Sequence, residues 1–143
     1  MSARRRPDER GSVLMLVPAG VLIVFVLASI AVDMSLVHLR KRQAFDLASA
    51  AANDAATAGA DQAALRSGSY VIEPGSARTV VADVVGASEL APHLAAPPSV
   101  TVTAEGVSVE ITLEADYIFA GVVPGAPDGA VVAASATAVA ETP

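Results

Sequence analysis

The chain of 143 residues carries a formal net charge of −6 and contains three Phe, two Tyr, no Trp and no Cys. These numbers exclude a disulfide framework and a thiolate metal site, and they leave few aromatic rings for stacking on bases or sugars. Residues 43–143 carry twelve acidic side chains against two basic ones, a net of −10, so the composition also speaks against a nucleic-acid partner.

The first predicted element is an uncharged stretch of 21 residues, 12–32, which follows a basic segment, 1–11. A helix of this length is about 31 Å long, close to the hydrocarbon thickness of a bilayer. We therefore expect a single transmembrane helix. The arginines before it and the acidic remainder after it favour an N-terminus in the cytosol and an extracytoplasmic C-terminal region. Pro18 predicts a kink or local loosening in this helix.

A secretory signal cleaved after Ala31 is the alternative for the same stretch, because Ser29 and Ala31 supply the small side chains that such cleavage needs. The stretch is longer than the core of an ordinary signal, and the helical pattern continues beyond it. The membrane helix is therefore the preferred interpretation.

An alanine-rich helical extension, 33–66, follows the apolar stretch. Ala is the best helix former, and small side chains recur along this segment at alternating intervals of four and three residues. Such a stripe lets another surface approach closely. The sequence leaves two alternatives for the surface that packs on the stripe: the chain's own sheet, or related helices in a filament. Both alternatives can be true for different sides of the helix. The stripe consists of Ala44, Ala48, Ala51, Ala55, Ala58, Gln62 and Leu65.

The remainder, 67–143, predicts a small α+β region. After an extended segment at 70–72, Ser76 is the expected N-cap of a short helix, 77–86, with valines on its inner face. Strict alternation of apolar and polar residues predicts a hairpin, 99–114, and small side chains predict a last strand, 130–141. The expected inward residues of the hairpin are Val107, Val109, Ile111 and Leu113. The fold class is therefore α+β, with a long N-terminal helix packed on a small antiparallel sheet.

Catalytic patterns find little support in the sequence. His38 and His93 fall in different elements, and no nucleophile elbow, phosphate loop or His-Glu-x-x-His motif occurs. Glu110, Glu114 and Asp116 lie close together but lack the loop spacing of a calcium site. We expect no enzyme activity, no cofactor and no metal.

Four short motifs follow one another along residues 8–60. They are Glu9–Ser12 before the apolar stretch, Val32–Asp33 at its end, Arg40–Ala44, and Asp46–Ala52. In order and spacing they resemble the TadE/TadG-like pilus-assembly family, pseudopilin-like membrane proteins of bacterial tight-adherence (Flp) pilus systems. The resemblance implies a pilin-like fold in the bacterial cytoplasmic membrane or a surface pilus. It also implies other pilin-like subunits or pilus-assembly membrane proteins as partners.

The resemblance further implies a processing site. A prepilin peptidase would cut between Gly11 and Ser12, which makes Ser12 the first mature residue. Leu16 then occupies the fifth mature position, where main pilins usually carry a Glu that pairs with a neighbour's terminal amine. This departure favours a minor component over a bulk filament subunit, and it leaves open whether the leader is cleaved. The alternative for Gly11 is a flexible residue before a membrane helix.

The remaining expected assembly positions are Pro18, Asp33, Arg40, Gln43 and Asp46. Asp33 stands at the outer end of the apolar stretch, where we expect a solvated boundary residue, with pairing to a basic residue of another subunit as the alternative.

The predicted function is a non-enzymatic minor pilin or pseudopilin in a bacterial pilus or secretion-type assembly that serves cell adhesion. The alternative is a single-pass, membrane-anchored extracytoplasmic binding domain outside any filament. A secreted enzyme, the third class, would need an active-site cluster that the sequence does not contain.

Overall fold

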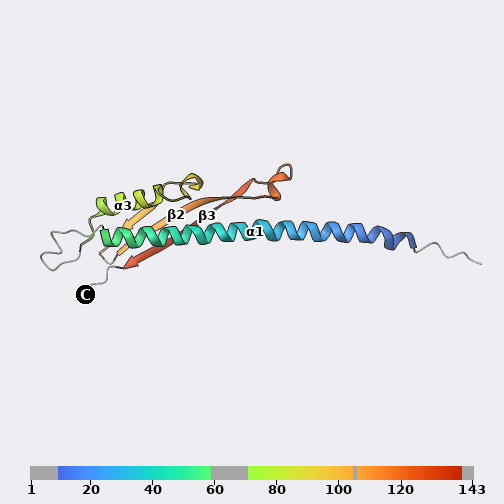
Figure 1. The fold of residues 1–143 in the computed structure, drawn as a ribbon, viewed down its shortest axis with the longest axis horizontal. Coiled ribbons are helices and arrows are strands. Elements are labelled where there is room, and N and C mark those ends of the chain that lie inside the picture. The colour runs from blue at the N-terminus through green and yellow to red at the C-terminus, as the bar shows by residue number, and fades with distance from the viewer. Residues whose placement is uncertain (1–9, 59–70, 105, 140–143) are drawn as a thin grey trace, which may run out of the picture.

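The computed structural model describes residues 10–58, 71–104 and 106–139, with side chains from residue 16 onward. It confirms the α+β fold: one long helix lies along a three-stranded antiparallel sheet (Figure 1). In chain order the elements are α1 (Arg10–Ala58), α3 (Pro74–Gly86), the 3-10 turn η1 (Ala91–His93), β1 (Ser99–Val102), β2 (Gly106–Asp116), the 3-10 turn η2 (Ala120–Val122) and β3 (Gly129–Val139).

Helix α1 is a single helix of 49 residues that continues on both sides of Pro18. Its C-terminal part lies against the sheet, whereas its N-terminal part extends beyond the rest of the molecule (Figure 1). The helix therefore joins the predicted apolar helix and its alanine-rich extension without a break. The expected continuation to residue 66 lies outside the described residues.

The sheet has the strand order β1-β2-β3, with β2 in the centre. The hairpin is confirmed: Val102 pairs with Val107, and the N–H of Thr103 donates to the carbonyl of Gly106 over 2.9 Å. Gly106 also lies opposite Val139 at the start of the β2–β3 ladder. A Cβ on Gly106 would collide with the carbonyl oxygen of Ala138, so this close approach of two backbones requires glycine.

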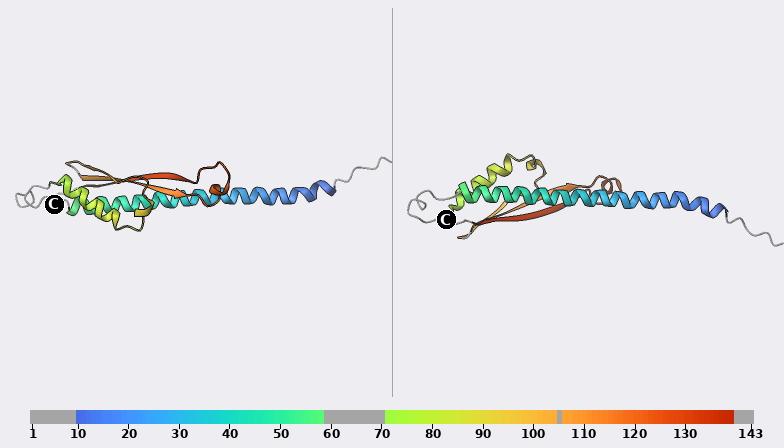
Figure 2. Two further views of the ribbon diagram at one scale, coloured as in Figure 1. Left: turned by 90° about the horizontal axis from the view of Figure 1, so that it is seen from above. Right: turned by 60° about the horizontal axis from the view of Figure 1, so that its bottom comes forward.

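The core lies between one face of the sheet and helices α1 and α3, with α1 over β2 and β3 and α3 beside α1 (Figure 2). The four predicted inward residues of β2 are all fully buried. Opposite them, Ala44, Ala48, Ala51 and Ala55 of α1 are also fully buried, with Ala52 and Ala56 nearly so. The chain's own sheet and α3 therefore cover the alanine stripe over residues 44–55. Ala58 is exposed, and Gln62 and Leu65 lie outside the described residues.

Helix α3 starts earlier than predicted. Its N-cap is Glu73, not Ser76, and the Glu73 carboxylate accepts hydrogen bonds from the backbone N–H groups of Gly75 and Ser76. The reason is Pro74, which has no N–H to satisfy and whose fixed φ suits the first helical position. The expected inner face is confirmed by Val81 and Val85, both buried in the core.

Candidate functional site

The N-terminal half of α1 is largely uncovered by the rest of the described chain, and we name residues 16–32 the bare half. From Leu16 to Val32 every large apolar side chain is exposed, over a range from 42% for Val32 to 69% for Leu16. In the part of the chain that the structure describes, α1 is the one helix long and apolar enough to cross a membrane, as an anchor or as a signal sequence. An apolar surface of this extent requires lipid or a partner to cover it.

The predicted processing site and two assembly positions belong to this half. The backbone of Gly11 and Ser12 is helical at the start of α1. Leu16 is exposed, and so is Pro18 two residues on. These residues lie on the part of α1 that extends beyond the sheet (Figure 1).

Asp33, directly after the bare half, is buried rather than solvated, with 5% of its surface exposed. Its Oδ1 accepts the backbone N–H groups of Ile118 (2.9 Å) and Phe119 (3.1 Å), and its Oδ2 accepts that of Ala120 (2.8 Å). The expectation of a solvated boundary residue is therefore wrong. Three consecutive backbone amides donate to this one carboxylate, and such an arrangement stabilises its ionised form.

The same contacts set the charge state of Asp33. Burial raises the pKa of its carboxyl group, but the hydrogen bonds from Ala120, Phe119 and Ile118 outweigh burial, and the pKa falls below its ordinary value of 3.8. Asp33 is therefore ionised at neutral pH and acts as a fixed anionic clamp.

The clamp holds the connection between β2 and β3. We name residues 117–123 the apolar loop, because Ile118, Phe119, Val122 and Val123 expose between 46% and 79% of their surface. Sequence reasoning missed this contact. More than 80 residues separate Asp33 from the loop, and no local pattern signals such a pairing.

The other predicted assembly residues lie further along α1. The guanidinium of Arg40 donates to Oε1 of Gln43 over 3.2 Å, one turn away, and both side chains are half-buried. Asp46 is exposed. The assembly residues are therefore spread along α1 and do not form one cluster.

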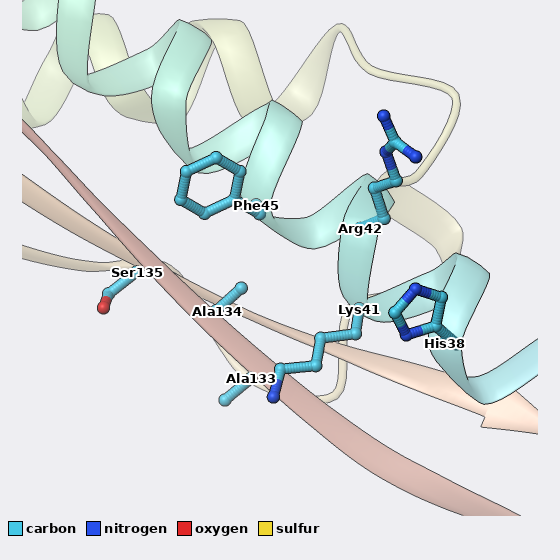
Figure 3. Close-up of a pocket in the computed structure, with 7 residues that line it drawn as sticks. All are labelled: His38, Lys41, Arg42, Phe45, Ala133, Ala134 and Ser135. Atoms are coloured by element: carbon cyan, nitrogen blue, oxygen red, sulfur yellow. The ribbon is translucent and has the colours of Figure 1, made fainter.

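A groove of about 600 Å³ lies between α1 and β3 (Figure 3). Basic and aromatic side chains of α1 form one wall, and short side chains of β3 form the other. Figure 3 shows Lys41 reaching across toward Ala133, with His38 beside it. The lining residues are His38, Lys41, Arg42, Phe45, Ala133, Ala134 and Ser135. The groove is a cationic opening on a body that is otherwise acidic, which suits an anionic partner.

Within the described residues, no group of three His, Cys, Asp or Glu side chains is placed to hold a metal ion. His93 lies in η1 and does not line the groove that contains His38. Comparison with family models, with curated proteins and with solved structures finds no match. The features of the described chain that bear on function are therefore the exposed half of α1, the Asp33 clamp and the groove.

Proposed function

We propose that this protein is a non-enzymatic, minor pilin-like component of a bacterial pilus or secretion-type assembly. In this proposal α1 is held in the cytoplasmic membrane with its N-terminus in the cytosol, and the α+β domain lies outside. The observation that carries the proposal is the division of α1 into a bare apolar half and a half that packs on a sheet. A subunit drawn from a membrane into a filament needs both halves, one for lipid or neighbouring helices and one to carry its domain.

Packing within the chain narrows where a neighbouring subunit would bind. Over residues 44–55 the alanine stripe is covered by the chain's own sheet and α3, so this part of it is not free for a second helix. In the bare half, residues 16–32, the described part of the domain leaves every large apolar side chain exposed. Helix-to-helix assembly would therefore use this half, where van der Waals contact is the main attraction between helices in lipid.

Leu16 supports a minor role within such an assembly. An acid at this position would be costly in lipid unless a neighbour's terminal amine paired with it. Leu16 forms no such pair, so the chain enters a filament without that attraction. A component that starts, caps or anchors an assembly tolerates this loss better than a subunit repeated along its length.

The groove favours a second candidate, a membrane-anchored binding domain outside any filament. Its volume of about 600 Å³ falls within the range of small-ligand sites, and the charges of Lys41 and Arg42 would select an anion. Under this alternative α1 serves only as an anchor.

The first experiment determines the N-terminus of the membrane-extracted protein by intact mass and terminal peptide mapping in its host. A start at Ser12, with or without a methyl group, would support prepilin-type processing. A start at residue 1 or 2 would leave a permanent anchor and favour the binding domain. A start at Val32 would indicate a secreted domain and overturn the proposal.

The second experiment compares two photocrosslinking positions in the full chain. A crosslinker at Val24 lies on the bare half of α1, and one at Ser135 lies in the groove. The proposal expects other pilin-like or assembly subunits captured from Val24. Capture from Ser135 alone would favour the binding domain.

A further inference from the structure

Outside α1, four of the exposed large apolar side chains in the described part of the chain lie together in the apolar loop. Val122 exposes 79% of its surface, Ile118 and Val123 each 57%, and Phe119 46%. Residues 117–127 contain no charged side chain, whereas Asp116 and Asp128 stand on either side of this stretch. Water is a poor environment for such a surface, so another phase or molecule should cover it.

The apolar loop lies beside the junction between the two halves of α1. The connection between β2 and β3 lies at the end of the sheet that points along α1 toward the bare half, in both Figure 1 and Figure 2. Three hydrogen bonds tie residues 118–120 to Asp33, the residue directly after the uncharged stretch 12–32. The loop is therefore fixed at the level where the apolar surface of α1 ends.

We propose that the apolar loop enters the boundary between headgroups and acyl chains of the lipid bilayer, as a second membrane contact beside α1, and that Asp33 holds it there. If the bare half fills the hydrocarbon layer, Asp33 lies at its edge, and the polar region extends roughly 5–7 Å further. The side chains of Phe119 and Val122 then meet acyl chains. Apolar side chains at this depth bind lipid in proportion to the area they bury.

Two observations favour lipid over a protein groove as the surface that covers the apolar loop: residues 117–127 are uncharged, and the loop adjoins exposed apolar side chains of α1. Ile30 and Met34 of α1, on either side of Asp33, are also exposed, so the loop extends an apolar surface that already faces the bilayer. The acids at the strand ends, Asp116 and Asp128, remain exposed on the aqueous side. This inference holds whether the protein joins a filament or serves as an anchored binding domain, because it requires only that α1 span the membrane.

The test uses the full chain in vesicles of phosphatidylcholine and phosphatidylglycerol. Because the chain has no cysteine, a single substitution gives one labelling site. Val122→Cys reports the loop, and Val131→Cys, 66% exposed on the sheet, is the matched control. Each carries an environment-sensitive fluorophore, which is quenched by nitroxide lipids labelled near the headgroup. We expect at least about three-fold stronger quenching at position 122 than at 131.

Equal quenching at the two positions would overturn the proposal. So would a label at position 122 that neither lipid nitroxides nor aqueous iodide can quench, because a protein partner would then cover the loop. Adding Asp33→Ala to Val122→Cys should reduce lipid quenching about two-fold or more. In the same Asp33→Ala background, a label at Val24→Cys should remain in lipid. Unchanged quenching at position 122 without the carboxylate would refute the role of Asp33, and a Val24 label in water would refute the membrane placement of α1.

Discussion

The two halves of α1 differ in which apolar side chains they expose: the N-terminal half exposes large ones, and the C-terminal half buries small ones. In the N-terminal half, large residues such as Leu22 and Phe25 expose about two thirds of their surface, at 66% and 68%. In the C-terminal half, Ala48 and Ala51 are fully buried. In a soluble protein the larger apolar side chains usually occupy the interior. Burial in this helix therefore follows the fit to the sheet and not the size of the apolar side chain.

Close approach explains the difference. Alanine lets the α1 backbone come near β2 and β3, and the larger side chains of the sheet, such as Ile111 and Leu113, fill the interior from the other side. The bare half meets no sheet, so nothing limits the size of its side chains. Four experiments test this contrast between the halves, from the largest expected effect to the smallest.

The largest effect should follow Leu113→Ala compared with Leu27→Ala. Leu113 is fully buried, so its truncation should lower the free energy of unfolding of the domain by about 3 kcal/mol. Leu27 is 60% exposed on the bare half, and its truncation should change that free energy by less than about 0.5 kcal/mol. Denaturant unfolding in detergent, followed by near-ultraviolet circular dichroism, measures both. Equal effects would show that the bare half also packs on the domain.

A charge should disturb the two halves in different ways. Val24→Arg should disfavour membrane insertion by about 2.5 kcal/mol or more and leave the domain stable. Asn53→Arg places the same side chain at an exposed position beside the alanine stripe and should leave insertion unchanged. Carbonate extraction of membranes, with immunoblotting of pellet and supernatant, measures insertion. Full retention of the Val24→Arg variant in the pellet would contradict the assignment of this half to lipid.

Added volume should be tolerated only away from the sheet. Ala48→Leu overpacks the contact with the sheet and should lower the free energy of unfolding by about 2 kcal/mol. Ala50→Leu, on the same helix at an exposed position, should change it by less than about 0.5 kcal/mol. Thermal unfolding of the two variants in one detergent gives the comparison. A stable Ala48→Leu variant would mean that the stripe is loosely packed.

The smallest effect is the pH dependence of the Asp33 clamp, at the junction of the two halves. Because folding lowers the pKa of Asp33, the clamp contributes full stability above the ordinary value of 3.8 and loses it as the pH falls through the lower folded value. The amide resonances of residues 118–120 should therefore be constant from pH 5 to 8 and shift together below about pH 3.8. Nuclear magnetic resonance of the chain in micelles records them.

The matched control for this titration is Asp33→Asn, which keeps the shape of the side chain and removes the ionisable group. Its amide resonances should show no common transition at low pH. A transition that persists in this variant would assign the titration to another carboxyl group.

Much of the fold was predictable because it follows from local periodicity. Alternation identified the inward residues of β2, and intervals of three and four identified Ala44, Ala48 and Ala51 as one face. Both patterns depend on repeats within a single element. The start of α3 was not predicted correctly, because Ser76 satisfied the usual capping pattern while Pro74 allowed an earlier start with Glu73 as the cap.

The candidate site was less predictable, since it depends on contacts between distant segments. Asp33 was identified as a boundary residue, but its burial depends on amides that come after β2. The groove likewise needs His38 and Lys41 from α1 opposite Ser135 from β3. The register that brings these segments together arises from packing of the whole sheet on α1. No short window of the sequence contains it.

Because α1 is unbroken, the orientation of the domain is tied to the orientation of the apolar half. Between Val32 and Ala58 the helix rises about 39 Å with no linker to absorb a change of angle. If the apolar half tilts by about 20° to match a thinner bilayer, the far end of the domain moves sideways by roughly 13 Å. Bilayer thickness would then set the direction in which the outer face of the sheet points and so determine which neighbours it can reach.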